Sequence, residues 1–541
     1  MAYTAHVDTF ARDNLPPKNQ WPELTFPLPE LKYPRRMNCA AELLDAMVGS
    51  GHADRTVIHT LIDGARFSCT YRQLMVRANQ IAHVLQQDLK LVPGTRVLLR
   101  GPNNPMMFAC WFAIIKAGCI AVATMPLLRA AELRQIIDKA RVSAALCDVR
   151  LREEMELAGS QCRDMKQILY FNDGRRGSLE DLLEFHPAEF TNVDTASDDV
   201  ALIAFTSGTT GQPKGTMHFH RDVMAMSDCF PRSCLLPTRR DICCGTPPIA
   251  FTFGLGSLLA FPMRFGASTV LIEKLTPESL LQAIQDFKAS VCFTAPTFYR
   301  QMAGLAKNYK LSSLKKCVSA GEALPDATRQ LFRQATGIQI IDGLGATEMI
   351  HIFISHTPER TRAGATGYAI PGYQATVLDD QGKPCAPGVV GRLAVKGPTG
   401  CRYLADDRQK IYVQKGWNIT GDAYSMDKDG YFYYQARTDD MIISAGYNIA
   451  GPEVEAALLM HEAIAECGVV GVPDEERGQV VKAFVVLKSG YTANEQMVKG
   501  LQDFVKAAIA PYKYPRRIEF VQSLPRTETG KLQRFKLRQM R

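Results

Sequence analysis

The chain has 541 residues, of which 46% are hydrophobic and 22% are charged, and its formal net charge is +8. A single core does not organise a chain of this length, so we expect three or four domain-sized units. The composition is that of a globular protein and excludes a low-complexity or repeat architecture.

The N-terminal region predicts a protein without a secretory signal or a membrane span. Residues 1–17 contain no apolar run behind basic residues, so they do not form a signal peptide. The longest apolar stretch, residues 106–126, is interrupted by Lys116 and Gly118. A membrane span is one interpretation, but a buried helix that continues into a strand is favoured. We therefore expect no membrane partner.

The fifteen cysteines predict reduced, buried thiols. They are scattered, with no Cys-x-x-Cys pair and no His/Cys cluster of zinc spacing. In a chain without a signal peptide this pattern is typical of a cytoplasmic protein.

Short apolar, β-branched runs alternate with amphipathic helical patterns over the first four hundred residues. This alternation predicts parallel sheets covered by helices. The expected strands include residues 95–99, 200–205, 268–272 and 338–341, and the expected helices include 130–139 and 277–287.

The pattern changes near Gly372. Residues 375–378 and 391–396 flank a turn-forming segment and predict hairpin strands in a β-rich subdomain. Beyond a boundary near residues 437–440, a compact α/β pattern follows, with a helix that begins at Pro452. We expect the rest of this C-terminal unit to contain strands at 467–470 and 480–487 and a helix at 493–509.

A loop rich in glycine and hydroxyl groups, residues 206–215, directly follows a predicted buried strand. Glycines let backbone N–H groups approach an anion, hydroxyls add donors, and Lys214 adds a positive charge. It differs from the common nucleotide loop, because no Gly-Lys-Ser/Thr closes a six-residue span. A flexible linker is the alternative, but the pattern favours phosphate binding.

The last thirty-one residues, Pro511 to Arg541, hold most of the positive charge, with nine Lys/Arg against two Glu. Nucleic-acid binding is one explanation, but the segment has few interleaved aromatic residues for base stacking. A solvated basic face is the second. A site for a polyanionic small molecule such as ATP or coenzyme A is the third, and the motifs favour it, so we expect no nucleic-acid partner.

Five segments resemble, in the same order, the signatures of the adenylate-forming superfamily of acyl- and aryl-CoA ligases, luciferases and peptide-synthetase adenylation domains. They correspond to the family's phosphate loop, magnesium-site motif, ribose-binding motif, domain hinge and catalytic-lysine loop. The resemblance covers about residues 200–531 and implies ATP-dependent activation of a carboxylic acid as an acyl-AMP. The segments are 206–215, 345–348, 420–422, 437–442 and 525–531.

The resemblance also implies an architecture. It is an α/β fold with a large N-terminal core, residues 1–438, of two parallel-type α/β sheets and a β-rich subdomain. A small mobile α/β lid, residues 439–541, would rotate about the hinge residue Asp439 between the two half-reactions. We expect a monomer or a homodimer.

The nucleotide site follows residue by residue from the motifs. Glu348 is a hard oxygen ligand suited to Mg²⁺, and the Thr347 hydroxyl would face the α-phosphate. Asp422 would accept hydrogen bonds from the ribose diol, with Arg437 beside it. The resemblance also implies that residues 320–323 lie along the adenine. Leu344 stands where the family often has an aromatic residue, so the adenine would not stack on a ring at that position. The ATP- and AMP-binding set is Thr206, Ser207, Gly208, Thr209, Thr210, Lys214, Gly321, Glu322, Ala323, Asp342, Gly343, Asp422 and Arg437.

Lys531 is the candidate catalytic cation. A lysine ammonium can bridge the substrate carboxylate and the α-phosphate where charge develops. Thr347, Glu348 and His351 complete the predicted catalytic group.

The acid pocket is expected to suit a flat aromatic ring, because two phenylalanines flank a small residue and glycines follow. Residues 347–353 resemble benzoate-type CoA ligases, in which the histidine at the position of His351 lies beside the substrate carboxylate. Residues 5–14 resemble 2-aminobenzoate (anthranilate) CoA ligases. The predicted acid-binding residues are Phe251, Thr252, Phe253, Gly254, Ala295, Gly345 and His351.

The acceptor is expected to be coenzyme A. Ser444, Gly446 and Tyr447 would form the face used for thioester formation. The candidates for binding the phosphates of coenzyme A are the basic residues Lys513, Arg516 and Arg517. The alternatives are a benzoate or hydroxybenzoate CoA ligase, a stand-alone enzyme that loads a carrier protein, and a luciferase-type oxygenase.

Overall fold

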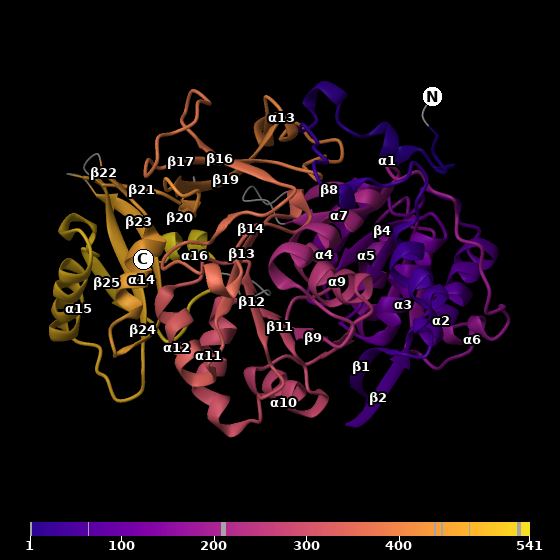
Figure 1. Cartoon of the computed structure of the whole chain (residues 1–541), viewed down its shortest axis with the longest axis horizontal. Coiled ribbons are helices and arrows are strands. Elements are labelled where there is room, and N and C mark those ends of the chain that lie inside the picture. The colour runs from indigo at the N-terminus through magenta and orange to yellow at the C-terminus, as the bar shows by residue number, and fades with distance from the viewer. Residues whose placement is uncertain are drawn as a thin grey trace.

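The computed structural model describes residues 3–62, 64–206, 213–437, 440–444, 447–474, 477–526 and 532–540, with the backbone alone for Tyr447 and Asn448. Four sheets organise the described chain (Figure 1). The first two are large and mainly parallel, the third is antiparallel, and the fourth lies in the C-terminal part.

The first sheet has the order β6-β5-β3-β4-β7-β8, and only the β7–β8 pair is antiparallel. Its strands are buried, as expected for a sheet that carries helices on its faces. The strands are β3 (Arg96–Arg100), β4 (Ile120–Thr124), β5 (Ala144–Asp148), β6 (Gln167–Phe171), β7 (Val200–Thr206) and β8 (Lys214–Phe219).

The second sheet has the order β15-β14-β13-β12-β11-β9-β10-β1-β2. Its six central strands run parallel, and antiparallel strands close both edges. The strands are β1 (Thr56–Ile62), β2 (Ala65–Thr70), β9 (Ile242–Gly245), β10 (Ser268–Val270), β11 (Val291–Thr294), β12 (Lys316–Ala320), β13 (Ile340–Gly345), β14 (Ile352–Ser355) and β15 (Tyr368–Ala369).

Helices in the N-terminal part begin where the sequence supplies caps. The Asn104 side chain accepts from Met107 N–H at the start of α3, and Pro105 occupies its first turn. The same apolar stretch then continues into β4, so the prediction of a buried helix followed by a strand is confirmed. The helices are α1 (Phe10–Asp13), α2 (Tyr71–His83), α3 (Pro105–Lys116), α4 (Ala130–Ala140), α5 (Arg152–Ser160), α6 (Leu179–Leu183), α7 (His220–Phe230), α8 (Thr252–Gly254), α9 (Phe261–Arg264), α10 (Pro277–Phe287), α11 (Pro296–Leu305), α12 (Asp326–Thr336) and α13 (Gln409–Tyr412).

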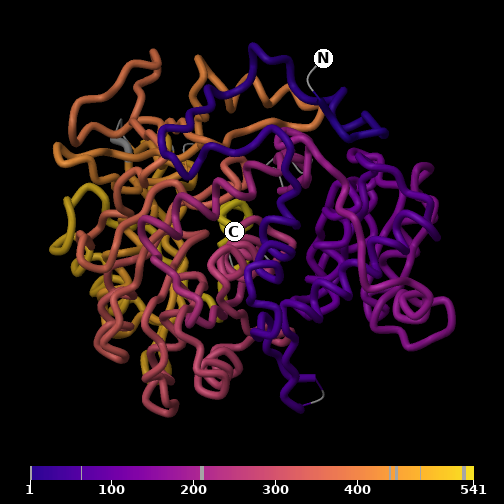
Figure 2. The backbone as a smooth tube through the Cα atoms, turned by 45° about the vertical axis from the view of Figure 1, so that its right-hand side comes forward, coloured from indigo at the N-terminus to yellow at the C-terminus, as the bar shows by residue number. Residues whose placement is uncertain are grey.

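The third sheet is the predicted β-rich subdomain, and β16 and β17 form the expected antiparallel pair. The N-terminal segment lies against this sheet (Figure 2), where Leu24 forms a bridge with Gly397 and Glu23 N–H donates to the Gly416 carbonyl. The strands are β16 (Gln374–Leu378), β17 (Gly391–Lys396), β18 (Val413–Gln414), β19 (Trp417–Met426) and β20 (Phe432–Arg437).

The fourth sheet has the order β22-β21-β24-β23, with β25 parallel to β24. The helix α14 packs on β23, and both α14 and α15 contribute to the core of this unit. The elements are β21 (Ile442–Ser444), β22 (Tyr447–Ile449), α14 (Gly451–Leu459), β23 (Ile464–Asp474), β24 (Gly478–Leu487), α15 (Glu495–Ala508), β25 (Arg517–Phe520) and α16 (Arg534–Gln539). The expected α/β architecture is therefore confirmed.

The basic tail is largely neutralised within the protein. Of its seven described Lys/Arg side chains, five pair with carboxylates elsewhere in the chain. These ion pairs connect the tail to residues 440–474 of the C-terminal unit. The pairs are Lys513–Glu453, Arg517–Asp474, Arg526–Glu466, Arg534–Glu455 and Arg538–Asp440. Arg516 stacks on Tyr514. Lys513 and Arg517, two of the candidates for binding coenzyme A, therefore already pair with carboxylates of the protein.

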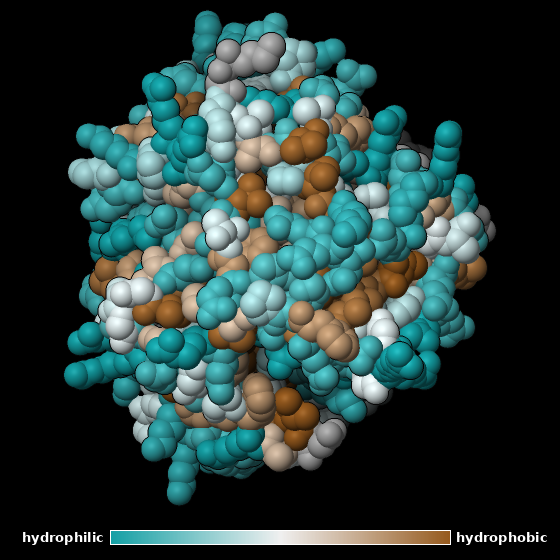
Figure 3. Space-filling view, turned by 90° about the vertical axis from the view of Figure 1, so that its right-hand side faces the viewer, coloured by the Kyte–Doolittle hydropathy of each residue, from teal (hydrophilic) through white to brown (hydrophobic). Residues whose placement is uncertain are grey.

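All fifteen cysteines are free, and fourteen of them are buried, as predicted. One face of the molecule is mainly hydrophilic, with apolar groups in small separate patches (Figure 3). Among the described residues, no helix is both long and apolar enough to cross a bilayer.

Candidate active site

The predicted phosphate loop connects β7 to β8 as a hairpin. Thr206 and Lys214, at its two ends, are register partners of the antiparallel ladder. Both side chains are half-buried. Ser207, Gly208, Thr209 and Thr210 lie outside the described residues.

Lys214 and Glu348 face the same tyrosine. The Lys214 Nζ lies 5.5 Å from the centroid of the Tyr403 ring, and the Tyr403 hydroxyl donates a hydrogen bond to Glu348 Oε1. Within the described chain neither charged side chain has an ion-pair partner. A cation and a carboxylate that contact the same tyrosine, each without an ion-pair partner in the described residues, are suited to bind a metal–phosphate ligand.

A tight turn presents Thr347 and Glu348 between β13 and β14. The turn is the 3₁₀ helix η10 (Thr347–Met349), and it ends at Ile350, whose φ is 65°. A β-branched residue rarely adopts this left-handed conformation. Such strained residues cluster at functional sites, where the surrounding packing holds them.

A buried polar network supports this turn from below. His218 Nε2 donates to the Thr347 carbonyl at 2.8 Å, and its Nδ1 lies 3.7 Å from Asp222 Oδ2. Asp222 also pairs with the buried guanidinium of Arg402. Burial opposes ionisation of Asp222, but Arg402 and His218 outweigh it and hold the pKa of Asp222 below its usual range. The network therefore fixes the backbone on both sides of Tyr403 and Thr347.

The predicted adenine segment lies at the carboxyl ends of neighbouring parallel strands. Gly321, Glu322 and Ala323 directly follow β12, and Asp342 and Gly343 lie on β13 in register with the end of β12. Ligands of open α/β sheets bind at this edge. Burial raises the pKa of Asp342 to about 7, although Arg329 opposes the shift.

The ribose candidates Asp422 and Arg437 form an ion pair across β19 and β20. They are register partners, and Arg437 Nη1 donates to Asp422 Oδ1 at 2.9 Å. Asp422 is buried and Arg437 is exposed. Burial raises the pKa of Asp422, and Arg437 opposes this shift.

A second buried tyrosine, Tyr412, lies beside Tyr403. Its ring packs edge-on against Tyr403 with 5.8 Å between centroids. Burial raises the pKa of Tyr412, and the charges that act on it include Glu348, Asp422 and Arg437. The charges of the metal and ribose motifs, far apart in sequence, therefore both influence the ionisation of Tyr412 without contacting its hydroxyl in the described structure.

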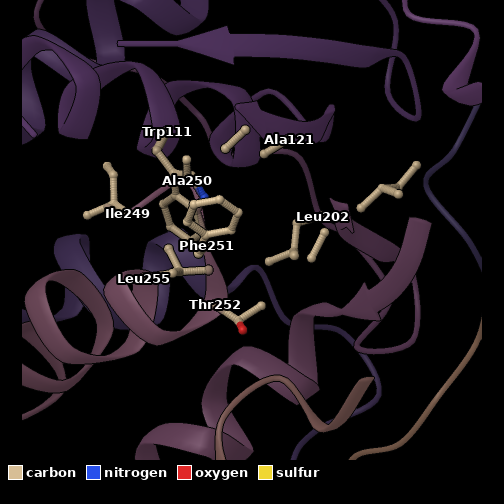
Figure 4. Close-up of a pocket in the computed structure, with 11 residues that line it drawn as sticks. Trp111, Ala121, Leu202, Ile249, Ala250, Phe251, Thr252 and Leu255 are labelled. Carbon is tan, nitrogen blue, oxygen red and sulfur yellow. The ribbon is translucent and has the colours of Figure 1, made fainter. Parts of the chain in front are cut away.

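Four of the predicted acid-pocket residues, Phe251 to Gly254, lie in or just before one helical segment, formed by α8 and the π-helical turn η8 (Leu255–Ala260). One face lines an apolar cavity against the first sheet (Figure 4). Phe251 and Thr252 belong to this face. The other lining residues are Trp111, Ala121, Ala123, Leu202, Ile203, Ala204, Ile249, Ala250 and Leu255.

The opposite face packs against His351. Its ring centroid lies 5.6 Å from that of Phe253, and its Nε2 lies 3.3 Å from the Phe253 carbonyl. Burial lowers the pKa of His351 to about 3, so the ring is neutral near pH 7. A Cβ on Gly256 would come within 2.3 Å of this ring, and a Cβ on Gly345 would come within 2.9 Å of the His351 backbone. These glycines therefore allow His351 to lie close to both segments.

The structure thus does not bring all seven predicted acid-binding residues onto one cavity wall. Phe253, Gly254, Ala295, Gly345 and His351 are absent from the lining of the cavity that Phe251 and Thr252 share. A Cβ on Gly254 would come within 2.1 Å of the Pro248 carbonyl, so this glycine is required for close backbone packing.

The C-terminal unit approaches the adenine segment through Arg526. Its guanidinium contacts Glu322 at 3.7 Å and Glu466 at 2.9 Å. Arg526 also forms a bridge with Leu532, so the two ends of the predicted catalytic-lysine loop are held side by side. Lys531 itself, like Asp439 and Gly446, lies outside the described residues.

The CoA-face candidate Ser444 is buried at the end of β21, where it pairs with the backbone of Tyr447 and of Gly478.

The donor set fits Mg²⁺. Mg²⁺ is usually held by one or two carboxylates together with substrate phosphates, and Glu348 offers one carboxylate beside the phosphate loop. The described residues contain no group of three or more His, Cys, Asp or Glu side chains arranged to hold a metal. The metal would therefore be shared with the nucleotide.

Sequence reasoning missed Tyr403 and Arg526 as contacts of predicted site residues. Tyr403 stands 55 positions from Glu348 in the chain, and no spacing rule connects the two. Arg526 belongs to the motif Pro525 to Lys531, but its partner Glu322 lies outside all five motifs, in the segment expected to bind the adenine.

Comparison with known proteins identifies the family of this chain. Residues 47–403 match the family of AMP-binding enzymes, and residues 453–531 match the AMP-binding enzyme C-terminal domain. The chain is 34% identical to benzoate–CoA ligase of Thauera aromatica over 94% of this chain and 97% of that protein.

Two solved structures share the fold over nearly the whole chain. The anthranilate CoA ligase AuaEII in complex with anthranoyl-AMP has a TM-score of 0.89 and 32% identity over 95% of this chain and 98% of that one. A benzoate CoA ligase from Burkholderia xenovorans LB400 has a TM-score of 0.84 and 29% identity over 93% and 100%. The chain belongs to the AMP-binding enzyme family and is an AMP-forming acid–thiol ligase, close to the aryl-CoA ligases.

Proposed function

We propose that this enzyme activates an aromatic carboxylic acid with MgATP and transfers the resulting aromatic acyl group to coenzyme A. The preferred acid is a benzoate with a small ortho substituent, 2-aminobenzoate first. The observation that carries the nucleotide chemistry is the position of Lys214 and Glu348, two uncompensated charges that face one tyrosine.

In the first half-reaction a carboxylate oxygen of the acid attacks the α-phosphorus of ATP. The bond from this phosphorus to the bridging oxygen breaks, and pyrophosphate leaves. Lys214 would bind phosphate oxygens, and Lys531 would bridge the carboxylate and the α-phosphate. Glu348 would hold Mg²⁺, whose charge offsets that of the phosphates. The Thr347 hydroxyl would orient the α-phosphate.

The nucleoside would lie along Gly321 to Ala323, with its ribose on Asp422 and Arg437. The Asp422 carboxylate has two acceptor oxygens, and Arg437 donates to Oδ1. The same carboxylate would also accept from a ribose hydroxyl.

In the second half-reaction the thiol of coenzyme A, as its thiolate, attacks the aryl carbonyl and AMP leaves. We propose that residues 439–541 act as a lid on the core of residues 1–438 and turn at Asp439. The face with Ser444, Gly446 and Tyr447 would then replace Lys531 at the site.

The aromatic substrate is supported by the benzoate and anthranilate ligases among the similar proteins. Phe251 and Trp111 both contribute aromatic rings to the lining of a small, mainly apolar cavity (Figure 4). The neutral His351 lies next to Phe253 on the other face of the same helical segment. Rings and small residues exclude long, flexible acids better than planar ones.

The test is a comparison of kcat/KM for 2-aminobenzoate, benzoate, 2-hydroxybenzoate and octanoate, with acyl-CoA measured by mass spectrometry. We expect 2-aminobenzoate to be preferred. Octanoate as the best substrate would refute the aromatic assignment, whereas benzoate as the best would refute only the ortho-amino preference. Acyl-AMP without acyl-CoA would indicate a carrier protein as the acceptor.

A further inference from the structure

Tyr403 contacts both the carboxylate and the cation proposed to bind the metal and the phosphates, Glu348 and Lys214. Its hydroxyl donates to Glu348 Oε1, and its ring lies under the Lys214 ammonium at 5.5 Å. The residue is buried, and its backbone is fixed by pairing with Thr216 of β8 and by a 2.9 Å hydrogen bond from its N–H to the buried Gln409 side chain. The hydroxyl therefore has a defined position relative to Glu348.

We infer that Tyr403 is a positioning residue that holds the Glu348 carboxylate for Mg²⁺ binding through its hydroxyl and places Lys214 beside the same metal–phosphate ligand through its ring. This inference rests on the metal role proposed for Glu348. Tyr403 itself touches neither the metal nor the nucleotide.

The hydrogen bond leaves the carboxylate free for a metal. Tyr403 occupies Oε1, and the other oxygen has no partner within the described chain. A phenolic hydroxyl is a hydrogen-bond donor in its ordinary neutral form, and a carboxylate is an acceptor, so the bond runs from Tyr403 to Glu348. Partners that orient a metal-binding carboxylate typically change metal affinity by about 10- to 100-fold when they are removed.

The ring adds a second effect. A cation over an aromatic face is held by the ring quadrupole, and Lys214 begins β8, the strand that pairs with Tyr403. The position of Lys214 is thus linked to that of Glu348 through one side chain.

Tyr412 supplies a matched control. It is also buried, and its ring packs edge-on against Tyr403, but its hydroxyl has no hydrogen-bond partner in the described structure. Tyr403→Phe and Tyr412→Phe therefore each delete one buried hydroxyl, and only the first deletion removes a bond to Glu348.

The experiment uses α,β-methylene-ATP, which cannot transfer its AMP group to an acid. Its binding is measured by calorimetry, once with excess Mg²⁺ and once with EDTA. The Kd in EDTA divided by the Kd with Mg²⁺ gives the coupling between metal and nucleotide. We expect Tyr403→Phe to reduce this ratio about tenfold, with the EDTA value unchanged, and Tyr412→Phe to leave the ratio as in the wild type. Glu348→Gln should reduce the ratio toward one. Tyr403→Leu, which also removes the ring, should weaken binding in EDTA as well.

The outcomes separate the two levels of the proposal. If Glu348→Gln keeps the wild-type ratio, the metal role of Glu348 is refuted, and the inference about Tyr403 is refuted with it. If Glu348→Gln loses the coupling but Tyr403→Phe behaves like Tyr412→Phe, only the positioning role is refuted. A Tyr403→Phe variant that binds the nucleotide more weakly in EDTA to the same extent would show a general structural effect and also refute it.

Discussion

Arg526, just before the segment that contains Lys531, contacts Glu322 in the predicted adenine segment at 3.7 Å. The same guanidinium pairs with Glu466 within the C-terminal unit at 2.9 Å. One side chain thus joins the C-terminal unit to the nucleotide side of the core, at the entrance to the catalytic-lysine loop.

Loss of the Glu322 contact should slow adenylation selectively. We expect Glu322→Gln to lower the rate of ATP–pyrophosphate exchange about two- to fivefold, because a partly exposed ion pair contributes up to about 1 kcal/mol. Thioester formation from pre-made aryl-AMP and coenzyme A should be unchanged. Glu466→Gln, which breaks only the pair within the C-terminal unit, is the matched control. Additive effects of Glu322→Gln and Arg526→Gln would show that the contact is not functional.

The Asp422–Arg437 pair predicts recognition of the ribose hydroxyls. In the wild type, ATP should be preferred over 2′,3′-dideoxy-ATP, because a buried acceptor left without a donor costs roughly 1–3 kcal/mol. Asp422→Asn should raise KM for ATP and bring this preference close to one. The kcat/KM values of both nucleotides in both enzymes provide the measurement. A variant that still discriminates as strongly as the wild type would exclude Asp422 as the ribose acceptor.

Lys531→Ala should abolish acyl-AMP formation, with a loss of about 10²- to 10³-fold, as for removal of a group that stabilises transition-state charge. Supply of pre-made aryl-AMP with coenzyme A should restore thioester formation. Lys536→Ala, which removes an exposed cation on α16, is the control and should leave both half-reactions intact. Near-normal adenylation by Lys531→Ala would refute the catalytic role.

The raised pKa of Asp342 predicts a pH-dependent stability. Burial raises the pKa of Asp342 from its ordinary value of 3.8 to about 7 in the folded protein. The stability it contributes is therefore complete below about pH 4 and is lost as the pH rises through 7. Asp342→Asn should be less sensitive to pH in this window, by a few kcal/mol at about 1.4 kcal/mol for each pKa unit.

Denaturant unfolding of the ligand-free protein at several pH values between 4 and 8 tests this expectation. Asp326→Asn removes a more exposed carboxylate that pairs with the same Arg329 at 3.5 Å, and it should change the pH dependence less. Parallel pH profiles for wild type and Asp342→Asn would contradict the raised pKa.

Local pattern predicted most of the elements. Residues 277–287 and 391–396 form the expected helix and strand at the expected positions, because caps and alternation act within a few residues. The expected strand at residues 467–470 proved to be the longer β23, since it also pairs with β24 beyond those residues. Pairing partners distant in the chain decide such ends.

The predicted site depended on motifs, and its supports depended on tertiary contacts. The basic residues of the tail were visible in the sequence, but the carboxylate partners of the five that form ion pairs are up to 98 positions away. The motifs favoured a polyanion site for this charge, and no local pattern showed that most of the described cations form internal ion pairs. Likewise, no local pattern separated the Phe251 face of α8 and η8 from the Phe253 face.

The hairpin formed by β7 and β8 affects the electrostatics of nucleotide binding. In many nucleotide sites the phosphate loop runs into a helix, and the positive end of the helix dipole offsets part of the phosphate charge. Here the chain leaves the loop as the strand β8. Mobile counterions and side-chain cations must then supply that compensation, so affinity for ATP should fall more steeply with ionic strength than in a site where a helix begins at the loop.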